Sequence, residues 1–252
     1  MKEAESARQK ISIPVLKETE RYLLVYKPPG ISFHMQGKKE GVMQILRRME
    51  EEKLISSGER IYPVHRLDEM TSGIMVFARG RKSAEELGNN FRHGRVEKYY
   101  VALSDRRPRQ KQGSVVGDMV RSRNSTWKLL HEKKNPAITF FITRRVLSER
   151  PLTLFLLKPK TGRTHQIRVA MKSLGSPVLG DQLYARYEMA REEDRGYLHA
   201  GAVRFELGGE LVEWIEKPRE GVEFLRPAFT SVWNSLGYVF DHMPKGRSVR
   251  PA

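Results

Sequence analysis

The sequence predicts an α+β fold in which helices are scattered among the strands of a mixed, mainly antiparallel sheet. Short runs rich in β-branched and aromatic residues outnumber the segments with helical periodicity, and the two kinds do not alternate regularly. No internal repeat or long low-complexity linker divides the 252 residues, a length sufficient for one domain with a sizeable core.

The predicted strands are short apolar runs at residues 22–26, 74–78, 99–103, 138–146, 152–157, 203–207 and 211–215. A Lys-Pro-Pro-Gly turn at residues 27–30 ends the first strand. The last two strands are joined through Gly-Gly-Glu at residues 208–210, which predicts a hairpin.

The predicted helices are segments whose apolar residues recur at intervals of three and four. The first carries Val42, Ile45, Leu46 and Met49 on one face. The second carries Ala84, Leu87 and Phe91, the third runs from an N-cap at Thr164 to Gly175, and the fourth begins near Pro227.

Composition limits the possible functions. Lys and Arg number 46 against 30 Asp and Glu, a net charge of +16, which favours a polyanionic partner such as nucleic acid. Cysteine is absent, which excludes disulfides, thiol nucleophiles, iron–sulfur clusters and cysteine-based zinc sites. No apolar run approaches the roughly 20 residues of a membrane span, and residues 1–10 lack the apolar core of a signal peptide. A soluble, cytoplasmic protein is therefore expected.

The positive charge is concentrated in residues 92–145. This segment holds 14 Lys and Arg against four acids, so it contributes +10 of the +16. Such a run is often only a solvated surface loop, but its density in an already basic chain favours a face that contacts phosphates.

Two constellations are candidates for chemistry. Asp68 follows His65, Arg66 and Leu67 and precedes a buried strand, so it is either a carboxylate kept ionised beneath a polyanion or an aspartate that caps its own turn. The second is the basic, glycine-containing turn at residues 158–168, which leads into a helix N-terminus and is typical of an anion site. Arg168 lies one turn inside that helix, off its apolar face.

Other catalytic layouts are not supported. The chain has no Gly-x-Ser-x-Gly nucleophile elbow, no clustered carboxylates for a two-metal nuclease and no His-x-x-x-His zinc spacing. No metal site is predicted.

Residues 65–73, His-Arg-Leu-Asp-x-x-Thr-Ser-Gly, resemble the catalytic motif of the RluA-type RNA pseudouridine synthases. Further segments match that family's other motifs in order, at residues 27–30 with His34, 98–102, 162–169, 180–184 and 198–200. The resemblance covers about residues 20–215.

The resemblance implies one catalytic domain with a long mixed sheet and a central RNA-binding cleft, which isomerises uridine in rRNA or tRNA without a cofactor or metal. Its bounds would be a 1–19 extension, a 20–216 catalytic domain and a 217–252 C-terminal helix and tail, with no S4 domain. A monomer is expected.

The same resemblance implies roles for individual residues. Asp68 would be the catalytic aspartate, as nucleophile at C1′ or base at C2′. Arg168 would pair with it through a bidentate fork, and Tyr100 would stack on the target uracil and help to remove the C5 proton. Arg66 would fill the gap left by the extruded nucleotide. The substrate-binding residues would be Arg66, His65, Lys27, Arg163, Thr164, His165 and Gln166.

Two alternatives stay open on the sequence. The first is a non-catalytic RNA-binding or RNA-folding protein on the same scaffold. The second is a carboxylate-based nucleosidase or glycosidase, which needs a second carboxylate beside Asp68, and the sequence offers no clear candidate.

Overall fold

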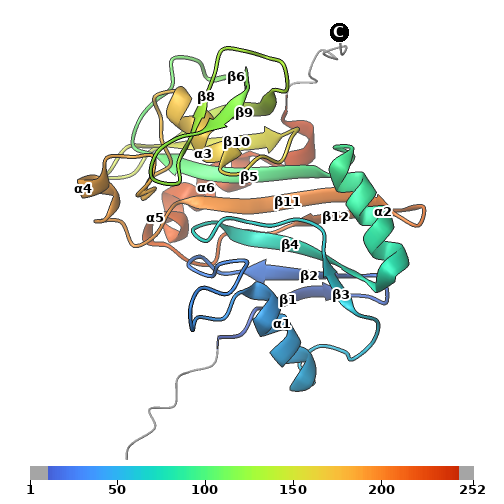
Figure 1. Ribbon diagram of the computed structural model, residues 1–252. Coiled ribbons are helices and arrows are strands. Elements are labelled where there is room, and N and C mark those ends of the chain that lie inside the picture. Colours follow the sequence, from blue (N-terminus) through green and yellow to red (C-terminus); the bar gives the residue numbers. More distant parts are fainter. Residues whose placement is uncertain (1–10, 244–252) are drawn as a thin grey trace, which may run out of the picture.

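A ten-stranded mixed sheet forms the centre of the fold (Figure 1). The computed structural model describes residues 11–243. The strand order is β1-β2-β4-β11-β5-β10-β9-β6, with β12 paired to β11 and β3 paired to β4. The strands of this sheet are β1 (Val15–Glu18), β2 (Tyr22–Lys27), β3 (Ile61–Pro63), β4 (Ser72–Arg79), β5 (Glu97–Ser104), β6 (Gln112–Gly117), β9 (Ala137–Val146), β10 (Leu152–Pro159), β11 (Leu198–Leu207) and β12 (Glu210–Ile215).

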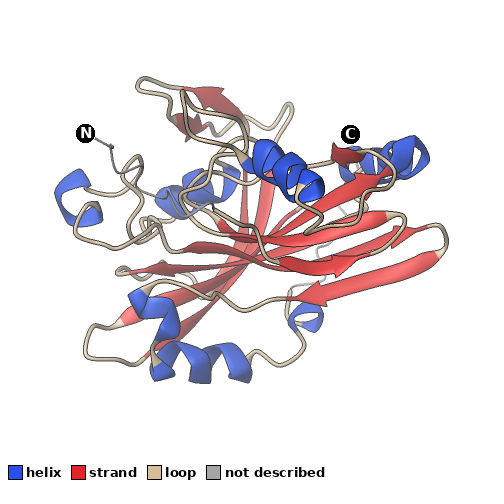
Figure 2. Cartoon of the chain, turned by 90° about the horizontal axis from the view of Figure 1, so that it is seen from below, coloured by secondary structure: helices blue, strands red, loops and turns tan. Residues whose placement is uncertain are grey.

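Helices lie on both sides of the sheet, and a separate hairpin projects from it (Figure 2). The hairpin pairs β7 (Met119–Arg121) with β8 (Trp127–Leu129). The helices are α1 (Val42–Glu51), α2 (Gly80–Arg92), α3 (Gln166–Ser173), α4 (Tyr187–Ala190), α5 (Val222–Leu225), α6 (Pro227–Ser235) and a 3₁₀ turn (Val239–Asp241).

Both faces of the central strands are buried, which explains why these strands read as continuous apolar runs. Along β4, Met75 and Phe77 pack into one core cluster, whereas Ile74 and Val76 pack into another on the opposite face. α1 buries Val42, Ile45, Leu46 and Met49, as its periodicity predicts.

The only parallel pairing among the described strands joins β4 to β11 at the centre of the sheet. Gly73 pairs there with Ala200, at φ +113°. A Cβ at Gly73 would lie 2.3 Å from the carbonyl oxygen of Ala200, so only glycine permits this approach. The approach fixes the chain a few residues after Asp68.

Three differences from the sequence predictions concern element boundaries. β1 pairs with β2 and Ile13 is fully buried, so the sheet begins before residue 20. Residues 104–145, predicted only as a basic segment leading into a strand, contain β6, β7 and β8, whose charges and glycines mask an apolar pattern. α3 begins at Gln166 with His165, not Thr164, at the N-cap.

The predicted C-terminal helix is α6, and it is part of the core. Phe229 and Trp233 pack in one cluster with Tyr99 and Leu154 of the sheet. The predicted tail beyond residue 243, like residues 1–10, lies outside the described residues. None of the helices within residues 11–243 is long and apolar enough to cross a membrane.

Candidate active site

A cavity of about 770 Å³ opens over the middle of the sheet, where the loop before β4, strand β5 and the turn before α3 meet. The volume suits a nucleotide-sized ligand. Its lining includes Asp68, Tyr100 and Arg168, the three residues predicted to be catalytic, which lie far apart in the sequence. Its other charged or titratable lining residues are basic: His65, Arg66, Arg92, His93, Lys98, Lys160, Arg163 and His165.

Asp68 lies in a turn between β3 and β4. Its carbonyl oxygen accepts a hydrogen bond of 3.0 Å from the N–H of Thr71. Its side chain is 20% exposed and points into the cavity region rather than back to cap its own turn. The next residue, Glu69, is held through its carbonyl oxygen, which accepts a bond of 2.8 Å from the N–H of Gly30.

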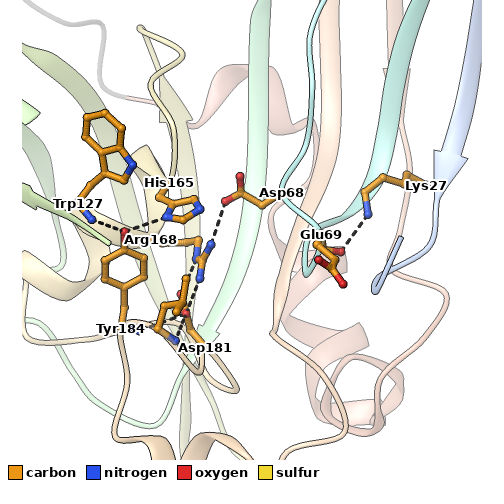
Figure 3. Close-up of polar contacts among 9 residues, drawn as sticks. Lys27, Asp68, Glu69, Trp127, His165, Arg168, Asp181 and Tyr184 are labelled. Carbon is orange, nitrogen blue, oxygen red and sulfur yellow. Dashed lines mark hydrogen bonds and ion pairs between the residues drawn. The ribbon is translucent and has the colours of Figure 1, made fainter. Parts of the chain in front are cut away.

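Arg168 contacts two carboxylates from its buried position on α3 (Figure 3). Nε and one terminal nitrogen each donate to Asp181 at 2.7 Å, and the other terminal nitrogen donates to Asp68 at 3.3 Å. Burial opposes the guanidinium charge, but the hydrogen bonds and charge of Asp181, with those of Asp68, outweigh it and raise the pKa of Arg168. The predicted bidentate fork therefore engages Asp181, and Asp68 receives a single bond.

Asp181 is the site residue that sequence reasoning missed. It is fully buried, and Oδ1 also accepts the N–H of Leu183 at 3.0 Å. The sequence feature that points to Asp181 is the Gly-Asp-x-Leu-Tyr segment at residues 180–184. This segment matches a motif of the family, but the resemblance assigned no role to its aspartate. A buried aspartate already paired this way orients Arg168 toward Asp68.

Tyr100 projects from β5 into the cavity and is 8% exposed. Burial raises the pKa of its phenol, and the negative charge of Asp68 raises it further. The hydroxyl group therefore stays protonated, and Tyr100 lines the same cavity as Asp68.

Tyr184 adds a second layer to the site. Its ring lies under the guanidinium group of Arg168, with 4.9 Å between the ring centre and the guanidinium carbon. Its hydroxyl oxygen accepts the backbone N–H of Trp127, the first residue of β8, at 2.8 Å and lies 2.9 Å from Nδ1 of His165. The β7–β8 hairpin is thus docked directly on the active site.

Two predicted substrate-binding residues have structural roles instead. Lys27 is fully buried, lies outside the cavity lining and uses its ammonium group on the carbonyl oxygens of Pro28, Ile31 and Glu69, at 2.8 to 3.1 Å. Burial lowers its pKa to about 7. Contact between Lys27 and RNA is excluded by this burial, and its contacts instead brace the loop that carries Asp68.

Gln166 is also buried and saturated with hydrogen bonds. Its carbonyl oxygen accepts from Thr161 Oγ1 and from the N–H of Arg163, and its amide donates to Ile138 and Thr139. It therefore holds the turn before α3 to strand β9 and has no free group for substrate.

The remaining predicted residues line the cavity. His65 Nε2 accepts the N–H of Val76 at 2.8 Å and its ring stacks on Phe91, so the ring is fixed and neutral. Burial, with the nearby Lys98 charge, lowers its pKa to about 3. Arg66, Arg163 and Thr164 are exposed at the cavity rim, and they are the side chains that a bound polyanion would meet.

The site combines one half-buried carboxylate, an arginine bonded to it and a tyrosine in the lining of the same basic cavity. Within the described residues, no group of three or more His, Asp or Glu side chains assembles in a way that could hold a metal ion. The fold and the basic cavity are those of a protein that binds an anionic polymer, with one partly exposed carboxylate available for chemistry.

Comparison with known proteins gives the family. Residues 21–173 match the family described as RNA pseudouridylate synthase. A protein of Haemophilus influenzae named as an uncharacterized RNA pseudouridine synthase is 38% identical over 217 residues, which cover 86% of this chain and 92% of that protein. The dual-specificity RNA pseudouridine synthase RluA of Escherichia coli is 34% identical over 171 residues, covering 65% and 78% of the two chains.

The fold agrees with a solved human structure, RNA pseudouridylate synthase domain containing 4, at a TM-score of 0.69 and 24% identity, covering 86% of this chain and 93% of that one. The chain belongs to the RNA pseudouridylate synthase family, as an RluA-type member. It is an isomerase that acts on RNA.

Proposed function

We propose that this enzyme converts specific uridines of rRNA or tRNA to pseudouridine, with Asp68 as the catalytic residue. The observation that carries the proposal is the single bond between Asp68 and Arg168 at the cavity, beside the Tyr100 ring. Arg168 orients the carboxylate through one charge-assisted hydrogen bond and leaves its other oxygen free of this contact.

The reaction breaks the N1–C1′ bond of uridine, turns the base and joins C5 to C1′. Asp68 acts either as a nucleophile at C1′ or as a base at C2′, and both roles need the ionised carboxylate. Tyr100 stacks on the uracil. Arg66, exposed at the rim, occupies the space that the target nucleotide leaves when it turns out of its stack.

The glycosidase alternative is disfavoured by the surroundings of the second carboxylate. Asp181 and Asp68 are linked by Arg168, which donates a hydrogen bond to each of them. Asp181 is fully buried, and both of its carboxylate oxygens accept hydrogen bonds from protein groups. It has no access to a water or a sugar in the cavity, which a two-carboxylate mechanism requires.

The experiment is pseudouridine mapping of rRNA and tRNA from cells with and without the protein, followed by tritium release from uridine-labelled RNA with Asp68→Asn. The substitution keeps the size of the side chain but removes its charge, so turnover should fall below a few per cent while RNA affinity changes little. The exposed Asp105→Asn is the matched control and should keep full activity. Substantial turnover by Asp68→Asn would remove Asp68 from the catalytic role.

A further inference from the structure

The hydroxyl group of Tyr184 has two neighbours and one proton. Its oxygen accepts the N–H of Trp127 at 2.8 Å, and Nδ1 of His165 lies 2.9 Å away. If Nδ1 carried a proton, both neighbours would donate to the oxygen and the phenol proton would have no acceptor among these contacts. The arrangement that satisfies all three groups has Tyr184 donating to an unprotonated Nδ1.

The proton of the neutral His165 ring is then on Nε2. Figure 3 shows the His165 ring between Tyr184 and Asp68, with the edge away from Tyr184 turned toward Asp68. His165 also lines the cavity. Burial and then the charge of Arg168 lower its pKa, as does Arg66, whereas Asp68 and Asp181 act in the opposite direction. A neutral ring presents one N–H donor to the cavity.

The backbone of His165 is also unusual. Its φ of +57° places it in the left-handed region, which non-glycine residues rarely adopt, and it caps α3 with no side-chain hydrogen bond to the helix. A strained residue at a cavity indicates that the position of its side chain matters. The ring of His165 contacts the hydroxyl group of Tyr184 and does not cap the helix.

We propose that His165 donates its Nε2–H to a carbonyl oxygen of the target uracil, and that Tyr184 is the positioning residue that fixes this tautomer. The proposal rests on the proposed function. When the N1–C1′ bond breaks, its electron pair goes to the uracil and the negative charge spreads over O2 and O4. A fixed N–H donor stabilises that charge, while its own proton stays on Nε2. C5 then bonds to C1′ and loses its proton, and N1 gains one, so the product is an isomer.

The β7–β8 hairpin takes part in the same hydrogen-bond network. Its contribution is the backbone N–H of Trp127, which occupies the Tyr184 oxygen as an acceptor and so directs the phenol proton to His165. The basic segment between β5 and β9 therefore helps to set the chemistry of the cavity.

The direct test is the histidine ¹⁵N spectrum of the full chain, which distinguishes a protonated from an unprotonated ring nitrogen. The His165 signals, assigned with His165→Gln, should show the proton on Nε2 between pH 6 and 8. Tyr184→Phe keeps the ring under Arg168 but removes the hydroxyl group, so the signals should shift to a mixture of tautomers. Tyr238→Phe is the control, because it removes an exposed hydroxyl group bonded to Arg204 and Glu213, outside the cavity.

Kinetics supplies the second readout. Tyr184→Phe should lower kcat about 5- to 10-fold with KM within about twofold, since one neutral hydrogen bond is lost. His165→Ala should lower kcat about 10²-fold, and His165→Gln should recover part of the loss because its amide is a donor. Tyr238→Phe should match the wild type.

A proton on Nδ1 in the wild-type spectrum, or a kcat of His165→Ala within twofold of wild type, would overturn the proposal. These results differ from those that would contradict the proposed function. An active Asp68→Asn enzyme would contradict the catalytic role of Asp68 but would leave the tautomer of His165 in the wild-type spectrum unchanged.

Discussion

Arg168 holds two carboxylates with one guanidinium group, and the two contacts are unequal. The fork to Asp181 is short, buried and bidentate, whereas the bond to Asp68 is single and 3.3 Å long. The fork fixes the plane of the guanidinium, and the stacking of Tyr184 against it adds to this. Asp68 is thus held by a rigid partner while its carboxylate stays accessible to a ligand in the cavity.

The two contacts of Arg168 predict different effects on stability and activity. Arg168→Ala leaves the buried carboxylate of Asp181 without its cationic partner, so it should lower the free energy of unfolding by about 3–5 kcal/mol as well as abolish activity. Arg168→Lys should fold more stably than the alanine variant, since an ammonium can pair with Asp181. It should still lose at least about tenfold in kcat, because a point charge cannot bridge both carboxylates.

Urea unfolding and tritium release on the same preparations check this, with the exposed Arg191→Lys as control. An Arg168→Lys variant with wild-type kcat would show that the hydrogen bond between Arg168 and Asp68 does not contribute to the rate of catalysis.

At the level of elements, sequence analysis is most accurate for strands and helices whose burial produces a regular pattern of apolar residues. The central strands are predicted by their continuous apolar runs, because both faces of these strands are buried. α1 is predicted by its helical spacing of apolar residues, because one face of that helix is buried. The strands β6 to β8 are not evident from the sequence, because β7 and β8 are only three residues long, β6 contains two glycines, and most of their residues are partly or fully exposed.

The site residues also differ in how far the sequence predicts them. Asp68, Tyr100 and Arg168 lie in motifs that the resemblance could assign, and the structure brings them to one cavity. The burial of Lys27 and the pairing of Arg168 with Asp181 depend on contacts between distant elements, which no local pattern encodes.

The strand β11 carries a buried histidine that should make the fold sensitive to acid. His199 is fully buried, with Nδ1 2.9 Å from Ser72 Oγ and Nε2 2.9 Å from the carbonyl oxygen of Glu216. Burial lowers its pKa to about 3, and the charges of Arg195 and Arg219 act in the same direction. The unfolded chain takes up a proton near pH 6.5 and the folded chain does not, so stability is full above pH 6.5 and falls as the pH decreases toward 3.

The loss at pH 5 should be about 2 kcal/mol from His199 alone. Urea unfolding at pH 7 and pH 5 measures it, and His199→Asn should reduce the difference between the two pH values by about that amount. The exposed His93→Gln is the control and should leave the difference as it is in the wild type. An equal pH dependence in His199→Asn and wild type would mean that His199 is protonated in the folded protein.

At the scale of the whole molecule, part of the excess positive charge lies beside the cavity. The β7–β8 hairpin docks on Tyr184, and the loop after it contacts the rim where Arg163 donates to the carbonyl oxygen of Asn135 at 3.3 Å. The basic residues of residues 104–134 are all exposed: Arg106, Arg107, Arg109, Lys111, Arg121, Arg123, Lys128, Lys133 and Lys134. Because the hairpin and the following loop adjoin the cavity, we expect bound RNA to meet their basic side chains.

This arrangement predicts how RNA affinity depends on salt. If the hairpin and its following loop contact phosphates, each contact contributes roughly 0.7–0.9 to the slope of log K against log salt concentration. Replacing Arg121, Arg123, Lys133 and Lys134 by alanine should therefore flatten the slope by about two to four units. The rate at saturating RNA should stay nearly intact, because none of the four side chains lines the cavity.

Filter-binding titrations at several salt concentrations measure the slope, and the control carries the same charge change elsewhere. Lys17, Lys53, Lys82 and Arg191 are exposed and lie outside the cavity lining, so their replacement by alanine removes four charges without removing the charged rim. The hairpin variant should lose several times more slope than this control, because condensed counterions are released only where side chains meet phosphates. Equal slopes in the two variants would mean that the basic segment serves solubility and that the RNA footprint lies on the cavity rim itself.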